Sequence, residues 1–246
     1  MLRGPIVKTT ASRTQGGQRP GGRAGEKPPT PRLVSSRSGV AVLAGLLLIA
    51  LVWLVWPSPF SKVKNLDSRG SSVIAFGDSL TAGFGAPAGE DYPSSLSKLI
   101  GVSVVNAGVS GDTTDAALAR IETDVLSKEP RIVIVGLGGN DFLRGVPRSS
   151  TETNLRAIVR KVQGSGAMVV LLGFTFPRLG ANYEEMYERV ADEEGCLLIP
   201  GILKGILTDS SLKSDEIHPN VRGYQLMAER VSAPCKKLIR KADAAR

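Results

Sequence analysis

The single histidine of this chain lies three residues after an aspartate. Asp215 and His218 fall in the segment Ser-Asp-Glu-Ile-His-Pro-Asn, and Ser79 lies far upstream in a Gly-Asp-Ser-Leu turn. A serine hydrolase needs an imidazole that takes the proton of the serine and a carboxylate that orients the imidazole. Residues three apart on a helical turn share a face, so Asp215 can reach one ring nitrogen and leave the other for the serine. We therefore expect Ser79, His218 and Asp215 to act as a catalytic triad.

Each of these features also has a plainer interpretation when it stands alone. Ser79 could simply cap a helix, and Asp215 with His218 could be an ordinary surface pair. The serine turn also lacks the Gly-x-Ser-x-Gly elbow of α/β-hydrolases, because Thr81 takes the last position. The triad therefore needs support from a third kind of group, the donors that stabilise a tetrahedral intermediate.

Two loops between the serine and the histidine offer such donors. Asn140, in Gly-Gly-Asn-Asp, carries a side-chain amide where the preceding glycines allow close approach of the backbone. Gly111 offers a backbone N–H at the start of a predicted helix, and the N–H of Ser79 is the third candidate. Either loop alone is better explained by turn chemistry. Together with the triad, they make Ser79, Gly111 and Asn140 candidate donors of an oxyanion hole.

A parallel sheet must position these loops. Five short runs are almost continuously apolar, which is typical of strands buried on both faces, at residues 72–76, 102–106, 131–137, 168–174 and 196–200. The segments between them have helical spacing, at residues 92–100, 113–127, 151–164 and 182–194. A last helix begins near Val221, and we expect Pro234 to interrupt it. The alternation predicts an α/β fold, a three-layer α/β/α sandwich with a five-stranded parallel sheet.

The polar loops fall where such a sheet binds its ligands, beyond the carboxyl ends of the strands. Residues 77–79, 108–113 and 138–141 follow the first three predicted strands, and residues 215–220 precede the last helix. We expect these four loops to meet at one edge of the sheet.

Residues 39–56 form an apolar run without one charged or strongly polar side chain. At roughly 1.5 Å per residue this run can cross a bilayer core of about 30 Å with help from flanking residues. Trp53 and Trp56 lie at its end, where indole rings favour the interface. A cleaved signal peptide is the alternative, but its apolar region is usually shorter and ends in a small-x-small site that this chain lacks. We expect an uncleaved transmembrane anchor.

The positive charge of the chain is concentrated before this run. Residues 1–38 carry eight Lys and Arg against one acidic residue, Glu26, whereas residues 70–246 carry 20 basic and 21 acidic residues. The tail is rich in Gly, Pro, Ser and Thr, so we expect it to be disordered, and its charge to keep it in the cytoplasm. A nucleic-acid role would lie away from the enzyme, and we expect no such partner. Residues 57–70 are expected to be a linker and residues 71–246 the hydrolase domain.

The remaining reactive side chains suggest neither a metal nor a cofactor. Asp78, Asp141 and Asp215 could indicate a metal-dependent phosphoesterase, but only one histidine is present and the Asn and Gly donors would have no role. Cys196 and Cys235 lie in the exported part, where an oxidising compartment permits a disulfide. We favour two independent buried residues.

Taken together, the four loops resemble the SGNH or GDSL-type hydrolase family over roughly residues 73–239. Within it the chain resembles the bacterial periplasmic thioesterase/arylesterase/lysophospholipase group, in stretches at residues 104–107, 110–113, 137–141 and 143–145. The resemblance implies a flavodoxin-like SGNH fold. It also implies that Ser79 is the nucleophile, His218 the base and Asp215 its partner, with Ser79, Gly111 and Asn140 as the oxyanion hole.

The resemblance implies an enzyme that hydrolyses an acyl ester or thioester, either a small molecule or a lipid. Together with the anchor it implies a single-pass protein of the bacterial inner membrane with a periplasmic catalytic domain. Phe142 and residues 174–183 depart from the group's pattern, so its acyl-chain preference does not carry over. A carbohydrate O-acetylesterase acting on cell-envelope sugars stays the alternative, and the oligomeric state stays open.

Overall fold

The computed structural model describes residues 41–42, 44–46, 60–175 and 182–245. The chain divides into two compact units, Met1–Trp56 and Pro57–Arg246. The predicted tail and most of the predicted membrane anchor lie outside the described residues. Within the described ranges, no helix is both long and apolar enough to cross a membrane. The α/β fold lies in the second unit.

Five parallel strands form one sheet in the order β2-β1-β3-β4-β5. The strands are β1 (Ser72–Gly77), β2 (Val104–Gly108), β3 (Pro130–Gly136), β4 (Met168–Leu172) and β5 (Leu197–Ile199). The central strands β1, β3 and β4 are almost entirely buried, as their continuous apolar character predicts. The predicted sheet is therefore confirmed, and its strand ends shift by no more than two residues.

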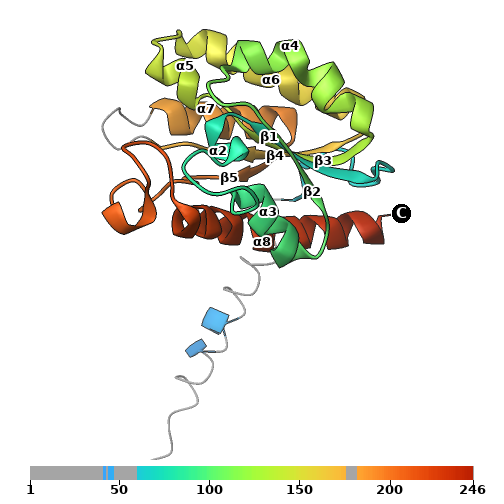
Figure 1. Ribbon diagram of the computed structural model, residues 1–246. Coiled ribbons are helices and arrows are strands. Elements are labelled where there is room, and N and C mark those ends of the chain that lie inside the picture. Colours follow the sequence, from blue (N-terminus) through green and yellow to red (C-terminus); the bar gives the residue numbers. More distant parts are fainter. Residues whose placement is uncertain (1–40, 43, 47–59, 176–181, 246) are drawn as a thin grey trace, which may run out of the picture. The chain divides into compact units, whose positions relative to one another are not determined.

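Helices cover both faces of this sheet (Figure 1). One face carries α3 (Tyr92–Ile100) and α8 (Val221–Ala244), which pack against each other. The other carries α4 (Thr114–Asp124), α6 (Arg148–Gly164) and α7 (Asn182–Glu194). Short helical segments complete the domain: α2 (Ser79–Ala82), η1 (Leu126–Lys128), α5 (Gly139–Leu143) and η2 (Ser210–Leu212). This is the expected three-layer α/β/α sandwich.

Pro234 does not interrupt the last helix. The helix α8 passes through it and continues to Ala244. The part beyond the proline buries Cys235, Leu238 and Ala242. Proline removes one intrahelical hydrogen bond, but most helical stability in proteins comes from packing of the apolar face. The predicted interruption at Pro234 is therefore wrong, because the buried side chains beyond it hold the helix in place.

Part of the segment expected to be a linker packs against the domain. In residues 60–70, Phe60 and Val63 are buried in the core. Asn65 Nδ2 donates to the carbonyl oxygen of Ala167 at 2.9 Å. This stretch belongs to the packed unit, so the described part of the domain begins at Phe60.

The two cysteines are separate, as favoured from the sequence. Cys196 lies just before β5 and Cys235 within α8, and both are free and buried. Burial raises the pKa of each thiol to about 12. The thiols are therefore protonated apolar side chains at neutral pH.

Candidate active site

The turn after β1 presents Ser79 as the first residue of α2. Asp78 caps this helix, because its Oδ1 accepts a hydrogen bond from the N–H of Leu80 at 3.0 Å. Only glycine fits at position 77, since a Cβ there would lie 2.5 Å from the backbone oxygen of Gly136 and 2.2 Å from Thr81 Oγ1. The strand thus passes into the helix through a tightly packed turn, and the Ser79 side chain stays partly exposed.

A chain of hydrogen bonds joins this serine to the two residues of the histidine loop. His218 Nε2 lies 3.0 Å from Ser79 Oγ, and His218 Nδ1 lies 2.7 Å from Asp215 Oδ2. A carboxylate accepts only, so Nδ1 carries the proton and Nε2 is free to accept one from the serine. The structure therefore brings Ser79, His218 and Asp215 together with the geometry of a nucleophile, a base and an orienting carboxylate.

Asp215 is fixed by its own loop. Its Oδ1 accepts from the backbone N–H groups of Ile217 and His218 at 2.9 and 2.8 Å. Burial alone would raise the pKa of the Asp215 carboxyl, but these two hydrogen bonds and the one to the imidazole outweigh it and lower the pKa. Asp215 is therefore ionised at neutral pH, as an orienting carboxylate must be.

Contacts from the other side hold the imidazole ring. The Phe84 ring lies 4.5 Å from the His218 ring, measured between centroids. Tyr224 of α8 donates its hydroxyl proton to the carbonyl of Phe84 at 2.7 Å. Asn220 caps α8 by accepting from the N–H of Gly223 at 3.2 Å. The histidine loop thus contacts the segment after α2 through Phe84 and is joined to the last helix through Asn220.

Asn140 lies in α5 on the opposite side of Ser79. Its Nδ2 donates to the carbonyl oxygen of Asp112 at 3.0 Å and lies 3.4 Å from Asp78 Oδ2. The first of these bonds fixes the amide plane. The second is long, so that N–H is only weakly held and can turn to an oxyanion.

The loop after β2 carries the other predicted donor. Gly111 has a φ of +88°, the left-handed region that favours glycine. Arg144 Nη2 donates to the Gly111 carbonyl at 2.8 Å. Within the described residues, the N–H groups of Gly111 and Ser79 make no hydrogen bond. Gly111 does not line the cavity in front of Ser79.

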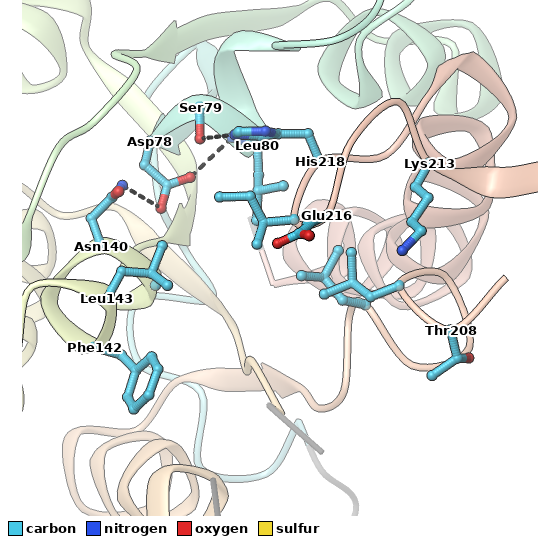
Figure 2. A pocket seen from close by; sticks show the side chains of 14 residues that line it. Asp78, Ser79, Leu80, Asn140, Phe142, Leu143, Thr208, Lys213, Glu216 and His218 are labelled. Carbon is cyan, nitrogen blue, oxygen red and sulfur yellow. Dashed lines mark hydrogen bonds between the residues drawn. The ribbon is translucent and has the colours of Figure 1, made fainter. Parts of the chain in front are cut away.

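A cavity of about 620 Å³ opens in front of Ser79 (Figure 2). Ser79, Asn140 and His218 line it, whereas Asp215 lies behind the histidine ring. Most of the other lining side chains are apolar, namely Leu80, Phe142, Leu143, Leu203, Leu207 and Ile217. Lys213 and Glu216 add charged groups on the His218 side. The site is thus a mostly apolar pocket with three polar groups at its reacting centre.

Two aspartates near the site have roles that the sequence did not reveal. Asp141 is buried and accepts from the N–H of Thr114 at 2.9 Å and from its hydroxyl at 2.5 Å, which ties α5 to α4. Burial, and to a smaller extent the nearby charges of Asp112 and Asp141, raises the pKa of Asp78 to about 7. Polar residues beside a glycine suggest a turn, so the sequence carried no sign of this burial.

Comparison with known proteins places the chain in a family. The model of the GDSL-like Lipase/Acylhydrolase family matches residues 75–226. Esterase TesA of Pseudomonas aeruginosa is 32% identical over 184 residues, covering 70% of this chain and 92% of the relative. Thioesterase 1/protease 1/lysophospholipase L1 of Escherichia coli is 32% identical over 195 residues, covering 75% of this chain and 94% of the relative. A crystal structure of TesA matches with a TM-score of 0.64 at 32% identity and covers 68% of this chain and 99% of that one. This chain therefore belongs to the GDSL-like lipase/acylhydrolase family.

Proposed function

We propose that this protein is a serine esterase that hydrolyses carboxylic ester or thioester bonds through an acyl-Ser79 intermediate. The observation that carries the proposal is the hydrogen-bonded series from Ser79 Oγ through both nitrogens of His218 to Asp215, at 3.0 and 2.7 Å. The names of the relatives, an esterase and a thioesterase/lysophospholipase, support the same reaction class.

The reaction follows from these positions. His218 Nε2 takes the proton of Ser79 Oγ as this oxygen attacks the carbonyl carbon of the substrate, and Asp215 stabilises the imidazolium. The carbonyl oxygen becomes an oxyanion, which accepts hydrogen bonds from the backbone N–H groups of Ser79 and Gly111 and from Asn140 Nδ2.

Collapse of this intermediate breaks the bond to the leaving alcohol or thiol, which takes the proton from His218. Water then attacks the acyl-Ser79 ester with the same imidazole as base. Breakdown of the second tetrahedral intermediate releases the carboxylic acid and returns the proton to Ser79 Oγ. One water is consumed, and no cofactor takes part in either half of the cycle.

The pocket favours an acyl group longer than acetyl. An acetyl group would fill only a small part of a cavity of about 620 Å³. Leu143 and Ile217 on its wall are 54% and 41% exposed, and an acyl chain would remove this apolar surface from water. Phe142 also lines the cavity, and its ring lies edge-on to Tyr183 at 5.6 Å between centroids. Phe142 and Tyr183, one from each stretch that departs from the family pattern, thus lie against each other, with Phe142 on the cavity wall.

A series of p-nitrophenyl esters from acetate to dodecanoate tests both parts of the proposal. We expect kcat/KM to rise from acetate to a medium or long chain, and Ser79→Ala to abolish turnover of every ester. Ser127→Ala is the matched control, because Ser127 is exposed and, in the part of the chain that the structure describes, its hydroxyl bonds only the Thr123 carbonyl. Unchanged turnover by Ser79→Ala would refute the nucleophile. A preference for acetate would instead favour the O-acetylesterase.

We also propose that the domain is anchored in the bacterial inner membrane and faces the periplasm. The proposal is supported by the apolar residues 39–56 and by the excess of basic residues before them. Alkaline phosphatase fused after Arg246 should be active in cells, and the same enzyme fused before residue 39 should be inactive. The reverse pattern would overturn the orientation.

A further inference from the structure

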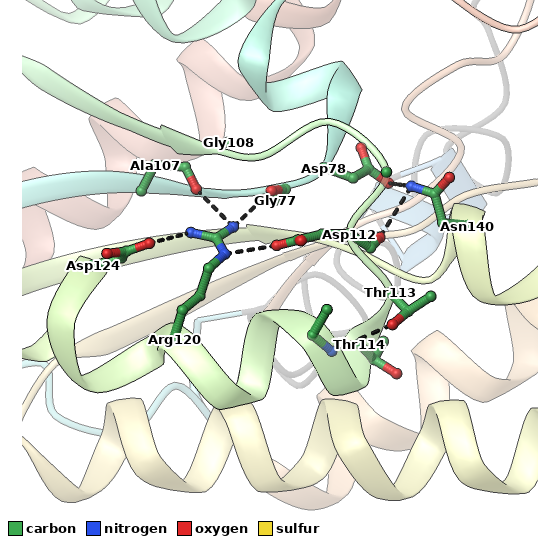
Figure 3. A network of polar contacts seen from close by, with 12 residues as sticks. Gly77, Asp78, Ala107, Gly108, Asp112, Thr113, Thr114, Arg120, Asp124 and Asn140 are labelled. Carbon is green, nitrogen blue, oxygen red and sulfur yellow. Dashed lines mark hydrogen bonds and ion pairs between the residues drawn. The ribbon is translucent and has the colours of Figure 1, made fainter.

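The side chain of Arg120, on α4, connects the loops that carry the oxyanion donors (Figure 3). We propose that Arg120 is a positioning residue that sets the rate of acyl transfer by holding these donors in place. The inference rests on the proposed esterase function. Arg120 itself touches neither the cavity nor the triad, and it acts through the loops that follow β1 and β2.

One guanidinium nitrogen joins the ends of two neighbouring strands. Arg120 Nη2 donates to the carbonyl oxygens of Gly77 and Ala107, each at 3.1 Å. Gly77 ends β1 just before the turn that carries Ser79, and Ala107 lies at the end of β2, before the loop that carries Gly111. This nitrogen therefore bridges the two strand ends from which the loops of the two backbone donors leave, in addition to the backbone bond from Val109 N–H to the Gly77 carbonyl at 3.0 Å.

A second bond links the same side chain to the third donor. Arg120 Nε donates to Asp112 Oδ2 at 2.6 Å, and the backbone carbonyl of Asp112 accepts from Asn140 Nδ2 at 3.0 Å. Asp112 also follows Gly111 directly in the chain. A shift of Asp112 would therefore move two donors. One is the Gly111 N–H, which precedes Asp112 in the chain, and the other is Asn140 Nδ2, which bonds the Asp112 carbonyl.

Each of the three guanidinium nitrogens of Arg120 donates a hydrogen bond. Nη1 donates to Asp124 Oδ2 at 2.7 Å, and Cζ lies 4.5 Å from the centroid of the Phe76 ring. The Arg120 side chain is only 16% exposed. A planar guanidinium can serve these four acceptors at once, whereas the single ammonium of lysine cannot. The loops around it are close-packed, since a Cβ on Gly108 would lie 2.2 Å from the backbone nitrogen of Ala82.

A second arginine of the molecule provides a matched control. Arg156 is 17% exposed and forms ion pairs with Glu152 at 2.8 Å, Glu193 at 2.9 Å and Glu194 at 3.0 Å. These partners lie on α6 and α7, and none lines the cavity. Removal of either arginine takes ion pairs from acidic partners, although Glu152 and Glu194 keep Arg189 and Arg160. Of the two arginines, only Arg120 is bonded to the donor loops.

The test compares full-length wild type, Arg120→Met, Arg120→Lys and Arg156→Met. We expect Arg120→Met to lower kcat by about 10- to 100-fold with KM within about twofold, because misplaced donors weaken the transition state more than the bound substrate. Its inhibition constant for a trifluoromethyl ketone, which forms a tetrahedral adduct with serine, should rise by a similar factor. Both values for Arg120→Lys should lie between those of Arg120→Met and the wild type. Arg156→Met should lose thermal stability but keep kcat within about twofold.

Equal kcat values for the two Met variants would overturn the proposal, and so would a loss in Arg120→Met that appears only in KM. Should Arg120→Met fail to fold, Arg120→Lys decides. A kcat below that of Arg156→Met supports the proposal, whereas a kcat equal to that of Arg156→Met refutes it. Failure of the proposed function is seen separately, since the wild type itself would then hydrolyse no ester.

Discussion

The two sides of the site are built in different ways. On the base side, Asp215 and His218 are three residues apart, and all three hydrogen bonds of Asp215 form within one partly exposed loop. On the oxyanion side, Asn140 reaches Asp112 and Asp78, residues 28 and 62 positions away in the chain. Arg120 joins that side to Gly77, 43 positions away.

Because of this difference, the two sides should contribute unequally to the stability of the fold. The base side needs only a local turn, so its residues can be changed with little effect on folding. The oxyanion side forms only when β1, β2 and the helices α4 and α5 have come together, so its residues also carry part of the tertiary structure. Substitutions should therefore affect rate alone on the first side, and both rate and stability on the second.

The largest effect should come from the base side. His218→Gln removes the proton acceptor, so we expect kcat to fall by about 10⁴-fold or more. The free energy of unfolding should change by about 1 kcal/mol or less, because within the described residues the ring makes hydrogen bonds only to Asp215 and Ser79, beside its contact with the Phe84 ring. Initial rates on a p-nitrophenyl ester and urea unfolding measure the two quantities. A large loss of unfolding free energy in His218→Gln would contradict the expectation that the base side affects the rate alone.

An intermediate effect should come from the oxyanion side. Asn140→Ala removes one donor, so kcat should fall by about 10²- to 10³-fold. It also breaks the bond to the Asp112 carbonyl, which should cost about 1 to 2 kcal/mol of unfolding free energy.

Asn154→Ala is the control for this variant. Asn154 Nδ2 donates to Thr114 Oγ1 at 3.2 Å, so its removal should lower stability without lowering kcat. Equal rate losses in the two variants would show that the loss in Asn140→Ala reflects folding rather than a missing donor.

The smallest effect concerns the pH dependence of stability. The pKa of Asp78 is raised by burial to about 7 from an ordinary 3.8. The unfolded chain therefore releases this proton near pH 4 and the folded chain near pH 7, so the cost of the buried carboxyl grows as pH rises between these values. Asp78→Asn cannot ionise, and its stability relative to wild type should rise by about 2 to 3 kcal/mol from pH 5 to pH 8. Thermal unfolding at both pH values checks this, and a constant difference would contradict it.

The same contrast explains what the sequence could predict. Asp215 and His218 stand out because their spacing is local and the chain has one histidine. The strands stand out because a sheet buried on both faces needs continuous apolar runs. Gly111 and Asn140 were found as polar loops after strands, and their roles came from the family resemblance.

Arg120 could not be found in this way. It lies four residues before Asp124, so the sequence suggests only an ordinary ion pair on a helix surface. Its bonds to Gly77 and Ala107 depend on how the strands meet, which no local pattern encodes. The burial of Asp78 and the continuation of α8 through Pro234 were missed for the same reason, because tertiary packing decides both.

The most direct test of the account is covalent labelling of the wild-type protein with a fluorophosphonate, followed by mass spectrometry of its peptides. We predict one adduct per chain, on Ser79, formed together with loss of esterase activity. Labelling should be much slower in His218→Gln and unchanged in Ser127→Ala. An adduct on another residue, or full activity after complete labelling of Ser79, would contradict the central claim that Ser79 is the nucleophile.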